Sequence, residues 1–460
     1  MFVRKILLSA LSLSLALSMC SACEDTKKTE YTAETAIPPE TETTAKPEET
    51  AAMSEFFPYA IPEPEDINTR RLGLHVEEDG TITLSGKPYY GFGVNYFGAF
   101  AHYWYQDIGD TAFSDAFKKL KEYGVDYLRL PFCGYWSDYY DAFDSDPEGI
   151  FAYLDRVVEE AEKNRLGIIV SLMWHDTAIP LHVGGHRSSM GDPDSELVRY
   201  ALDYTASVVS RYAGSNAVWA WEIGNEYNLS ADLCDAVNWS WLEIGENEPS
   251  GYDYYTSEEL RTFYSLISAK IREYDGWRMI TTGNGEMRGS SKAMMQASRR
   301  MNKSDHTWEV AWDLNSRTDF IEMNEYMTPD PIDCVCFHLQ QGSGDGSGVY
   351  TETMSPFSGE GVITQREYFT AYKQAADSLG KACVFGEMGD FLDMNGAPDI
   401  EEHFRALCED IRASGIQLAL TWQFQDFTDE GVDGMKLSVI GEMNEALKAE
   451  GLSDISGAWD

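Results

Sequence analysis

The sequence contains few basic residues for its length. Lysine and arginine contribute 35 of its 460 residues, against 77 aspartates and glutamates, so the formal net charge is −42 at pH 7. Nucleic acids and anionic lipid surfaces are bound through clustered basic side chains, so this charge argues against both as partners. It fits a soluble protein that works outside the cell on a neutral polymer.

Metal-binding cysteine pairs are also missing. Six cysteines lie beyond the N-terminal region, at positions 133, 234, 334, 336, 383 and 408, and none of them forms a CxxC motif. This spacing argues against a zinc site. Cys334 and Cys336 are two residues apart on an expected strand, so they face the same side and do not easily bridge. We expect buried free thiols, and neither a metal nor a cofactor.

A single long apolar run is present, at the N-terminus. Two basic residues precede the apolar run from Ile6 to Leu17, and small residues then lead to Cys23. The pattern predicts a signal peptide over residues 1–22, too short to span a bilayer comfortably. It resembles a bacterial lipoprotein signal, in which Cys23, or alternatively Cys20, would accept the lipid. A secreted protein without an anchor is the other interpretation, and both place the mature chain outside the cytoplasm.

The region after the signal peptide divides into a spacer and a folded domain. Residues 23–55 are rich in threonine, glutamate, proline, lysine and alanine, and they hold too few large apolar side chains to form a core. We expect a disordered spacer there and one large domain over residues 56–455. At its start, apolar segments at 74–76 and 81–84 flank an Asp-Gly turn. This predicts a β-hairpin that plugs one end of a barrel.

From residue 90 onward, strand-like and helix-like segments alternate. Strands are predicted at 90–96, 125–131, 167–174, 217–224, 278–282, 332–337, 382–385 and 417–424. Helices are predicted at 112–123, 148–165, 194–212, 256–274, 365–378, 399–413 and 439–448. The region 284–330 must supply a further helix, although it shows no clean periodicity. The count predicts an α/β fold, a (β/α)₈ TIM barrel.

Two of these strands end in a glutamate, at Glu226 and Glu387. In a parallel barrel, chemistry takes place at the carboxyl ends of the strands. A retaining glycosidase needs one carboxylic acid and one carboxylate about 5–5.5 Å apart. A single glutamate at a strand end is more often a surface carboxylate, so the prediction depends on the pair. We expect Glu226 to be the acid/base, Glu387 the nucleophile, and Asn225 a donor to the sugar 2-hydroxyl.

The order of short motifs along the chain carries a family resemblance. The motifs are Leu-Arg-Leu-Pro at 128–131, Trp-His at 174–175, Gly-Asn-Glu at 224–226, a histidine at 338, Phe-Gly-Glu at 385–387 and Thr-Trp at 421–422. From about Leu74 to Gln425 the chain resembles glycoside hydrolase family 5, the former cellulase family A. The resemblance implies a retaining glycosidase that cleaves β-linked glycans without a cofactor.

The resemblance also implies roles for further residues. Arg129 would hydrogen-bond Glu387 and keep it ionised, and His175 and His338 would contact sugar hydroxyls or the catalytic carboxylates. Trp422 would form the stacking floor beneath the cleaved sugar. Each has a structural alternative: a salt bridge for the arginine, and core packing for the histidines and the tryptophan.

One position departs from the family pattern. The family usually has a tyrosine two residues after the histidine of the sixth strand, where this chain has Gln340. Gln340 could act as the donor instead, another tyrosine such as Tyr350 could take its place, or the chain could be a divergent member. The departure bears on the substrate more than on the reaction.

Aromatic residues cluster in the expected loops after the strands, at 103–105, 135–140 and 239–241. Such rows stack on sugar rings in an extended cleft, although loop aromatics also pack simply to hold loops together. We therefore expect an endo-acting, monomeric enzyme, with β-mannan and β-glucan as leading substrates. A surface glycan-binding protein that has lost catalysis is the rival hypothesis, and transglycosylation is a third.

Overall fold

The computed structural model describes residues 54–64, 72–97, 104–234, 253–339, 349–350, 357–389, 399–424 and 431–459. The predicted signal peptide, Cys20, Cys23 and nearly all of the predicted spacer lie outside these residues. So do Gln340 and the aromatic cluster at 239–241. Those predictions stay predictions.

Eight parallel strands form the centre of the fold. They are β4 (Gly91–Asn95), β5 (Tyr127–Pro131), β6 (Gly167–Met173), β7 (Val218–Gly224), β8 (Met279–Thr281), β9 (Cys334–Leu339), β12 (Ala382–Met388) and β13 (Leu418–Thr421). Their order in the sheet is β8-β7-β6-β5-β4-β13-β12-β9. The ends of this sheet meet at Asp333, whose N–H donates to Ile280 O at 3.0 Å and whose carboxylate accepts from Ile280 N–H at 2.6 Å. The sheet thereby closes into a barrel.

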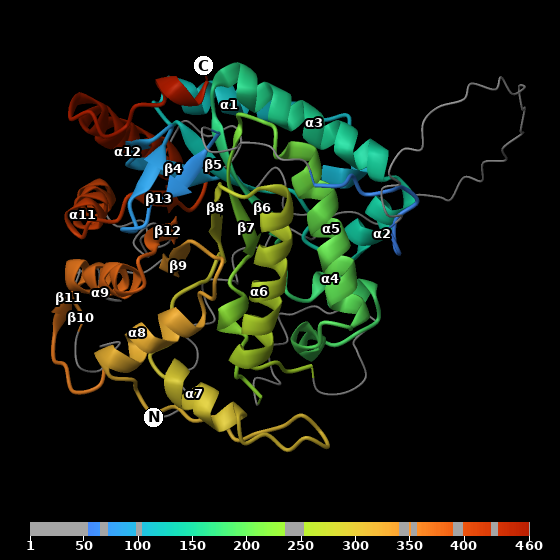
Figure 1. Ribbon diagram of the computed structural model, residues 1–460. Coiled ribbons are helices and arrows are strands. Elements are labelled where there is room, and N and C mark those ends of the chain that lie inside the picture. The colour runs from blue at the N-terminus through green and yellow to red at the C-terminus, as the bar shows by residue number, and fades with distance from the viewer. Residues whose placement is uncertain are drawn as a thin grey trace, which may run out of the picture. The chain divides into compact units, whose positions relative to one another are not determined.

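One long helix follows each barrel strand. These helices are α1 (Ala112–Glu122), α3 (Pro147–Asn164), α5 (Glu196–Tyr212), α6 (Ser257–Tyr274), α8 (Arg317–Tyr326), α9 (Gln365–Ser378), α11 (Ile400–Ala413) and α12 (Gly431–Ala449). Figure 1 shows them around the outside of the strands. The alternation confirms the predicted (β/α)₈ barrel, whose strands are buried on both faces.

Local signals fix several helix boundaries. Thr256 caps α6: its hydroxyl accepts from Glu259 N–H at 3.2 Å, and the Glu259 carboxylate accepts from Thr256 N–H at 2.7 Å. This reciprocal pair satisfies donors that the first helical turn leaves free. At the other end of α1, Gly124 adopts a φ of 75°, a left-handed conformation that favours glycine and stops the helix.

The structure adds elements that the sequence patterns did not indicate. Two short helices, α2 (Asp138–Ser145) and α4 (Ala178–His182), lie in the connections after β5 and β6. The region 284–330 supplies two helices, α7 (Ser291–Ser298) and α8, and α12 begins at Gly431 rather than at 439. A small antiparallel pair, β10 (Val349–Tyr350) with β11 (Ile363–Thr364), precedes α9. Short helices are missed because they offer too few turns to show a period.

An N-terminal sheet closes one end of the barrel. It contains β1 (Leu74–Val76), β2 (Ile82–Leu84) and β3 (Lys87–Pro88), all antiparallel, which confirms the predicted hairpin. Leu74 and Leu84 are fully buried in one cluster with Met279, Leu418 and other side chains from the first residues of the barrel strands. The hairpin therefore forms the floor of the barrel, at the end opposite the strand tips.

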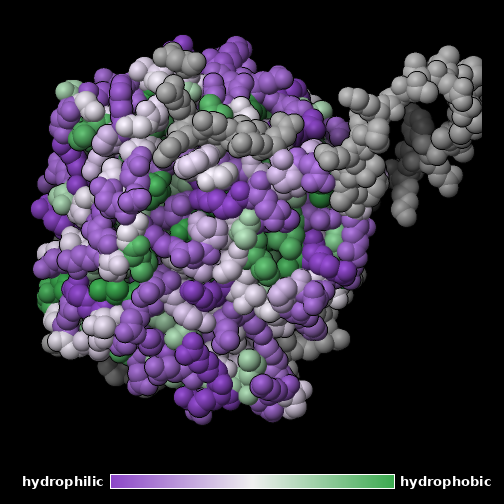
Figure 2. All heavy atoms as spheres, viewed as in Figure 1, coloured by the Kyte–Doolittle hydropathy of each residue, from purple (hydrophilic) through white to green (hydrophobic). Residues whose placement is uncertain are grey.

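The surface is largely polar, as the high content of charged residues predicts, and the cysteines are buried. Figure 2 shows a face that is mostly hydrophilic, with hydrophobic residues in small groups. The six cysteines beyond the N-terminal region are buried and free, as predicted. Within the described residues, no helix has the length and apolarity needed to cross a membrane.

Candidate active site

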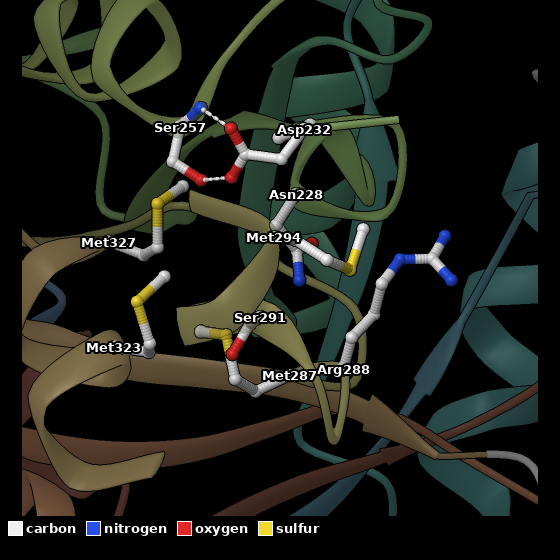
Figure 3. Close-up of a pocket in the computed structure, with 10 residues that line it drawn as sticks. Asn228, Asp232, Ser257, Met287, Arg288, Ser291, Met294, Met323 and Met327 are labelled. Carbon is white, nitrogen blue, oxygen red and sulfur yellow. Dashed lines mark hydrogen bonds between the residues drawn. The ribbon is translucent and has the colours of Figure 1, made fainter. Parts of the chain in front are cut away.

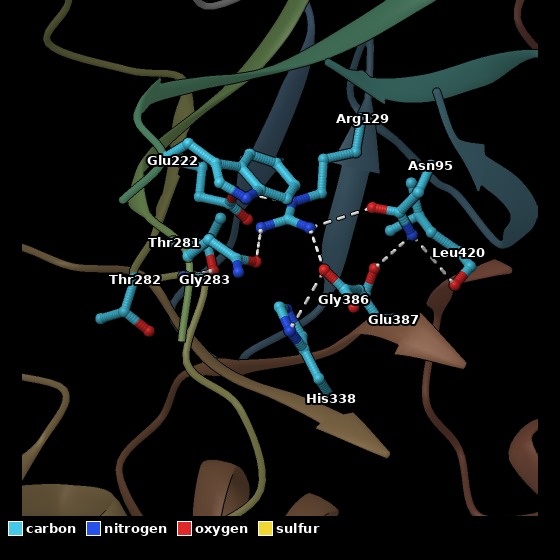
Figure 4. A network of polar contacts seen from close by, with 12 residues as sticks. Asn95, Arg129, Glu222, Thr281, Thr282, Gly283, His338, Gly386, Glu387 and Leu420 are labelled. Atoms are coloured by element: carbon cyan, nitrogen blue, oxygen red, sulfur yellow. Dashed lines mark hydrogen bonds and ion pairs between the residues drawn. The ribbon is translucent and has the colours of Figure 1, made fainter. Parts of the chain in front are cut away.

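A buried arginine lies at the centre of a polar network at the carboxyl ends of the strands (Figure 4). Arg129 on β5 is 1% exposed. Its Nη1 donates to Glu387 Oε1 at 2.7 Å and to Asn95 Oδ1 at 3.0 Å. Its Nη2 donates to Asn225 Oδ1 at 2.8 Å, and its Nε donates to Glu222 Oε1 at 2.6 Å. The guanidinium thereby connects strand ends that are far apart in the sequence.

Two members of this network, Asn95 and Glu222, were not found from the sequence. Asn95 ends β4, and its Nδ2 donates to Gly386 O at 2.9 Å, which ties β4 to β12 next to Glu387. Glu222 lies inside β7, and only 1% of it is exposed. In both cases the available signal was a polar residue in an otherwise apolar strand, because such a residue needs a buried partner.

An irregularity in β12 directs Glu387 into the barrel. Phe385 pairs with Phe337, but Glu387 pairs with His338, so the register shifts by one residue at Gly386. Without this bulge, Glu387 would face the same side as Phe385, whose ring packs 5.2 Å from Phe369 on helix α9. The extra residue turns the carboxylate to the interior, where His338 lies.

The two glutamates and His338 form a close group. Ligand atoms of Glu226, His338 and Glu387 all lie within 4.8 Å of one another. His338 Nδ1 is 3.1 Å from Glu226 Oε1 and 3.5 Å from Glu387 Oε1. Such a group of three could also hold a cation, but Arg129 donates to the same Glu387 oxygen, and its positive charge opposes a cation there. The separation matches a pair of carboxylates that act together on one bond.

Arg129 separates the protonation of the two buried carboxylates. The pKa of Glu226 is raised from 4.5 to about 7 by burial, and the charges of Arg129 and Arg288 oppose this only in part. Burial also raises the pKa of Glu387, while the bond from Arg129 lowers it. Because the guanidinium donates directly to Glu387, we assign the negative charge to Glu387 and the shared proton to Glu226.

His338 stays neutral beside this pair. Burial lowers its pKa to about 4, so the ring carries one proton at neutral pH. Among the described residues, no hydrogen-bond partner reaches its buried Nε2. The ring can thus exchange a hydrogen bond with Glu226 through Nδ1 without adding a charge to the site.

Aromatic side chains form one wall of the site. The Trp174 ring lies over the Arg129 guanidinium, with 4.4 Å from Arg129 Cζ to the ring centroid. Phe97 stacks on Trp174 with centroids 4.8 Å apart and lies 5.4 Å from Trp422. Trp422 is only partly buried. The structure therefore places Trp422 next to the network, where a sugar could stack on it.

His175 lies at the edge of the same wall. Its ring is 4.9 Å from the Tyr135 ring, and Tyr135 lies 6.0 Å from Phe97. Thr177 N–H lies 3.3 Å from His175 Nδ1 and the Thr177 hydroxyl 2.7 Å from it, so Nδ1 accepts and the proton is on Nε2. Burial lowers the pKa of His175. The neutral ring therefore offers an N–H donor.

Comparison with known proteins gives this geometry a family. A family model described as Cellulase (glycosyl hydrolase family 5) matches residues 84–427. The chain belongs to glycosyl hydrolase family 5. The match includes every residue of the network, and it confirms the resemblance that the motifs indicated.

Individual relatives of this family 5 chain are distant. Mannan endo-1,4-beta-mannosidase A from Emericella nidulans is 23% identical over 286 residues, which are 60% of this chain and 57% of that protein. Probable mannan endo-1,4-beta-mannosidase A-2 from Aspergillus terreus is 31% identical over 184 residues, 35% of this chain and 44% of that protein. The matched stretch thus spans about half the length of these curated relatives.

A solved structure supports the fold of this family 5 chain. An endo-1,4-beta-mannanase from Rhizomucor miehei superposes with a TM-score of 0.53 at 14% sequence identity. The superposition covers 81% of this chain and 99% of that one. At this identity the likeness shows the barrel alone.

Several loop aromatics of the family 5 barrel are buried. Trp104 and Tyr105 are 6% and 8% exposed, and Tyr139 and Tyr140 are 0% and 1% exposed. Trp104 stacks on Tyr153 with centroids 4.7 Å apart. For these four residues the sugar-stacking expectation was wrong, because their rings pack between loops and helices. Figure 1 shows α2, which carries two of them, on the outside of the barrel.

Two other glutamates share part of the sequence context of Glu226, since Glu325 also follows an asparagine and Glu286 also follows a predicted strand. The second Asn-Glu dipeptide, at 324–325, lies inside α8, and Asn324 Nδ2 donates to Phe320 O at 2.9 Å within the helix. Glu286 follows β8 and accepts from the Tyr368 hydroxyl at 2.8 Å. Burial raises its pKa. Neither residue belongs to the group around Arg129.

A small methionine-lined cavity of about 10 Å³ lies among residues that follow β7 and β8 (Figure 3). Met287, Met294, Met323 and Met327 line it, together with Asp232 and Arg288. Asp232 Oδ1 accepts from Ser257 N–H at 3.0 Å and from the Ser298 hydroxyl at 2.5 Å, and Oδ2 accepts from the Ser257 hydroxyl, so both oxygens are already bonded. None of Glu226, His338 and Glu387 lines this cavity, so it is separate from their group.

Proposed function

We propose that the protein is a retaining glycoside hydrolase that cleaves a β-linked glycan. The observation that carries the proposal is the pair Glu226 and Glu387, with ligand atoms within 4.8 Å and Arg129 bonded to only one of them. A double displacement requires two carboxyl groups at this short distance, one of them protonated and the other ionised. An inverting enzyme needs a wider gap, because a water must fit between them.

Glu387 acts as the nucleophile. It is 4% exposed at its side chain, and the Arg129 guanidinium holds one of its oxygens at 2.7 Å. In the first step this carboxylate attacks the anomeric carbon, an ester bond forms, and the glycosidic C–O bond breaks. The leaving oxygen takes the proton of Glu226.

Glu226 acts as the general acid and then as the general base. Its pKa of about 7 keeps a large share of the residue protonated near neutrality. In the second step its carboxylate takes a proton from water, and the water oxygen attacks the anomeric carbon and releases Glu387. Two inversions at one carbon leave the anomeric configuration unchanged.

The substrate we propose is a β-1,4-linked mannan, cleaved within the chain. The two curated relatives and the solved structure described above are named as mannan endo-1,4-beta-mannosidases or as an endo-mannanase. The partly exposed Trp422 beside Phe97 offers a face on which a pyranose ring can stack. β-Glucan is the alternative polymer, and the assay must include it.

The first experiment measures new reducing ends with the chain that lacks residues 1–22. Mannan, glucomannan, β-glucan, carboxymethylcellulose and xylan are the substrates. We expect hydrolysis of mannan, with product anomers that retain the β configuration when followed by NMR. A rapid fall in viscosity for few new ends would support internal cleavage. Inverted products would contradict the double displacement.

Two variants test the assigned roles. Glu387→Ala should lower turnover by about 10⁴-fold or more, since no nucleophile remains. Glu226→Ala should lose activity mainly on substrates with poor leaving groups, and added azide should restore activity on activated aryl glycosides. Glu286→Ala is the matched control, because this carboxylate lies outside the pair and should affect binding at most.

The rival proposal is a glycan-binding protein without catalysis. Retention of a 2.7 Å bond between Arg129 and Glu387, with a second carboxylate within reach, speaks against an idle site. No hydrolysis of any of the polymers, together with retarded migration in a glycan-containing gel, would favour the glycan-binding protein.

We further propose that the mature chain is a lipoprotein outside the cytoplasm. The sequence from Ile6 to Cys23 supports this, and the acidic composition fits an extracellular enzyme. Cys23→Ser should move the protein from the membrane fraction to the soluble fraction. Unchanged partitioning in Cys23→Ser, with release in Cys20→Ser, would assign the lipid to Cys20 instead.

A further inference from the structure

Glu222 is a buried carboxylate beneath the catalytic pair. It lies on β7, four residues before Glu226 in the sequence, and its side chain is 1% exposed. In the register of the sheet it faces Ser171 of β6 and Thr281 of β8. Glu222 therefore does not reach a substrate at the strand tips, and any influence on the reaction must act through Arg129.

The contact between Glu222 and Arg129 fixes the orientation of the guanidinium. Glu222 Oε1 accepts from Arg129 Nε at 2.6 Å, which is the guanidinium nitrogen bonded to the aliphatic part of the side chain. This leaves Nη1 for Glu387 and Asn95, and Nη2 for Asn225. A planar fork with its Nε held has little freedom to rotate, so its terminal nitrogens stay aimed at the catalytic residues.

The same contact changes the charge that the catalytic pair experiences. Burial alone would lower the pKa of Arg129, but Glu222 and Glu387 outweigh it, so the guanidinium stays charged. One positive charge thus faces two carboxylates inside the barrel. Without Glu222, the charge on Arg129 would act undiminished on Glu387 and on Glu226, which is close by.

We propose that Glu222 is a positioning residue that holds Arg129 by its Nε and offsets its charge, so that the shared proton remains on Glu226. The inference rests on the proposed hydrolase function. It assigns a role to a residue that touches neither the substrate nor the reacting atoms.

The direction of the effect follows from the charges. Arg129 lowers the pKa of Glu226 and of Glu387, and a carboxylate next to Arg129 counteracts this. If Glu222 is made neutral, both pKa values should fall. The alkaline limb of the pH–rate profile reports loss of the Glu226 proton, and the acid limb reports protonation of Glu387. Both limbs should therefore move to lower pH.

Apart from Glu286, whose pKa burial raises above its usual value and which is the same in wild type and variant, the groups named here do not change charge in this range. His338 has a pKa of about 4 and is already neutral. Burial raises the pKa of Cys133, Tyr135 and Cys336 to about 12, and it raises that of Tyr264 well above its usual value. Arg288, which opposes the raised pKa of Glu226, carries the remaining positive charge nearby. A shift in both limbs is then attributable to Glu222.

The decisive variant is Glu222→Gln in the full mature chain. Glutamine keeps the size and a carbonyl oxygen for Arg129 Nε but removes the negative charge. We expect both limbs of kcat/KM to move about one pH unit lower, so that the rate above the alkaline limb falls about tenfold. A uniform loss of rate with unmoved limbs would overturn the proposal, as would an unchanged profile.

Asp275→Asn is the matched control. Asp275 pairs with Arg278 at 2.7 Å, and both side chains are 0% exposed, like the pair under test. This pair precedes β8, at the opposite end of the barrel from the strand tips. The control should lower the melting temperature without moving either limb. A shift in the control would show that any buried ion pair produces the effect.

A second measurement does not depend on turnover. Because the raised pKa of Glu226 makes stability depend on pH, the melting temperature should fall as the pH rises towards about 7. In Glu222→Gln this fall should begin at the same pH, set by the unfolded chain, but end at a lower pH and be smaller. If the wild type hydrolyses none of the polymers, the proposed function fails, but the pH dependence of the melting temperature still tests the role of Glu222. Identical pH dependence of the melting temperature in wild type and Glu222→Gln would reject that role.

Discussion

Glu226 is held in a backbone conformation that glutamate rarely adopts. Its φ is 56°, and its N–H donates to Gly283 O at 2.8 Å, across the tips of β7 and β8. The left-handed region costs a residue with a Cβ about 1 kcal/mol. The hydrogen bond fixes this conformation, in which Glu226 Oε1 lies 3.1 Å from His338 Nδ1.

The raised pKa of Glu226 makes a prediction about stability. A carboxyl group whose pKa is higher in the folded state is easier to ionise after unfolding, so its ionisation destabilises the fold. The cost is absent below about pH 4.5, grows up to about pH 7, and is then constant at up to about 3 kcal/mol. Glu226→Gln should therefore be more stable than the wild type at about pH 8 and equal to it at about pH 4.

Urea denaturation at the two pH values measures this difference. The exposed Asp115→Asn serves as control, since the Asp115 side chain is 92% exposed and its replacement should leave stability equally unchanged at both pH values. An advantage of Glu226→Gln that is the same at both pH values would show that the gain comes from packing rather than from ionisation.

At the scale of an element, the bulge in β12 decides where Glu387, the proposed nucleophile, points. Gly386 occupies the extra position, and a Cβ there would lie 2.6 Å from His338 Nε2 and 2.8 Å from His338 Cδ2. His338 is buried and cannot move away freely. The glycine is thus required by the close approach of the two strands.

Gly386→Ala should therefore lower activity more than it lowers stability. The added methyl group displaces His338 and with it the neighbour of both carboxylates, so we expect a loss in kcat of about 10²-fold. Gly361→Ala is the matched control, because a Cβ at Gly361 meets nothing within 4 Å. Equal kcat in the two variants would contradict the role of the bulge. Kinetics and circular dichroism on both proteins give the answer.

Over the whole molecule, stability and chemistry lie at opposite ends of the barrel. The hairpin β1–β2 fills the floor with fully buried side chains, whereas the polar network lies at the strand tips. Gln417, directly before β13, joins the hairpin to the barrel. Its Oε1 accepts from Ile82 N–H at 2.7 Å, and its Nε2 donates to Ile82 O at 2.9 Å. Substitutions in the hairpin should therefore affect the active site only if they unfold the protein.

Leu84→Ala tests this division. Leu84 is 0% exposed, so its truncation should lower the free energy of unfolding by about 2–5 kcal/mol through lost burial and a cavity. The kcat should stay within about twofold of the wild type at temperatures well below the melting transition. Val362→Ala, at a side chain that is 61% exposed, should change neither quantity. A strong fall in kcat for Leu84→Ala would show that the floor shapes the site.

The sequence by itself determined the alternation of strands and helices, and it pointed to both glutamates of the proposed pair. These follow from apolar runs of strand length, from caps such as Thr256, and from carboxylates placed directly after buried strands, all of which are local patterns. Only the tertiary structure decided which residues meet. Asn95 and Glu222 join Arg129 because the sheet closes in one register, and Glu387 faces His338 because one residue bulges from β12. Barrel closure and register depend on contacts between strands distant in the sequence, so no local pattern contains them.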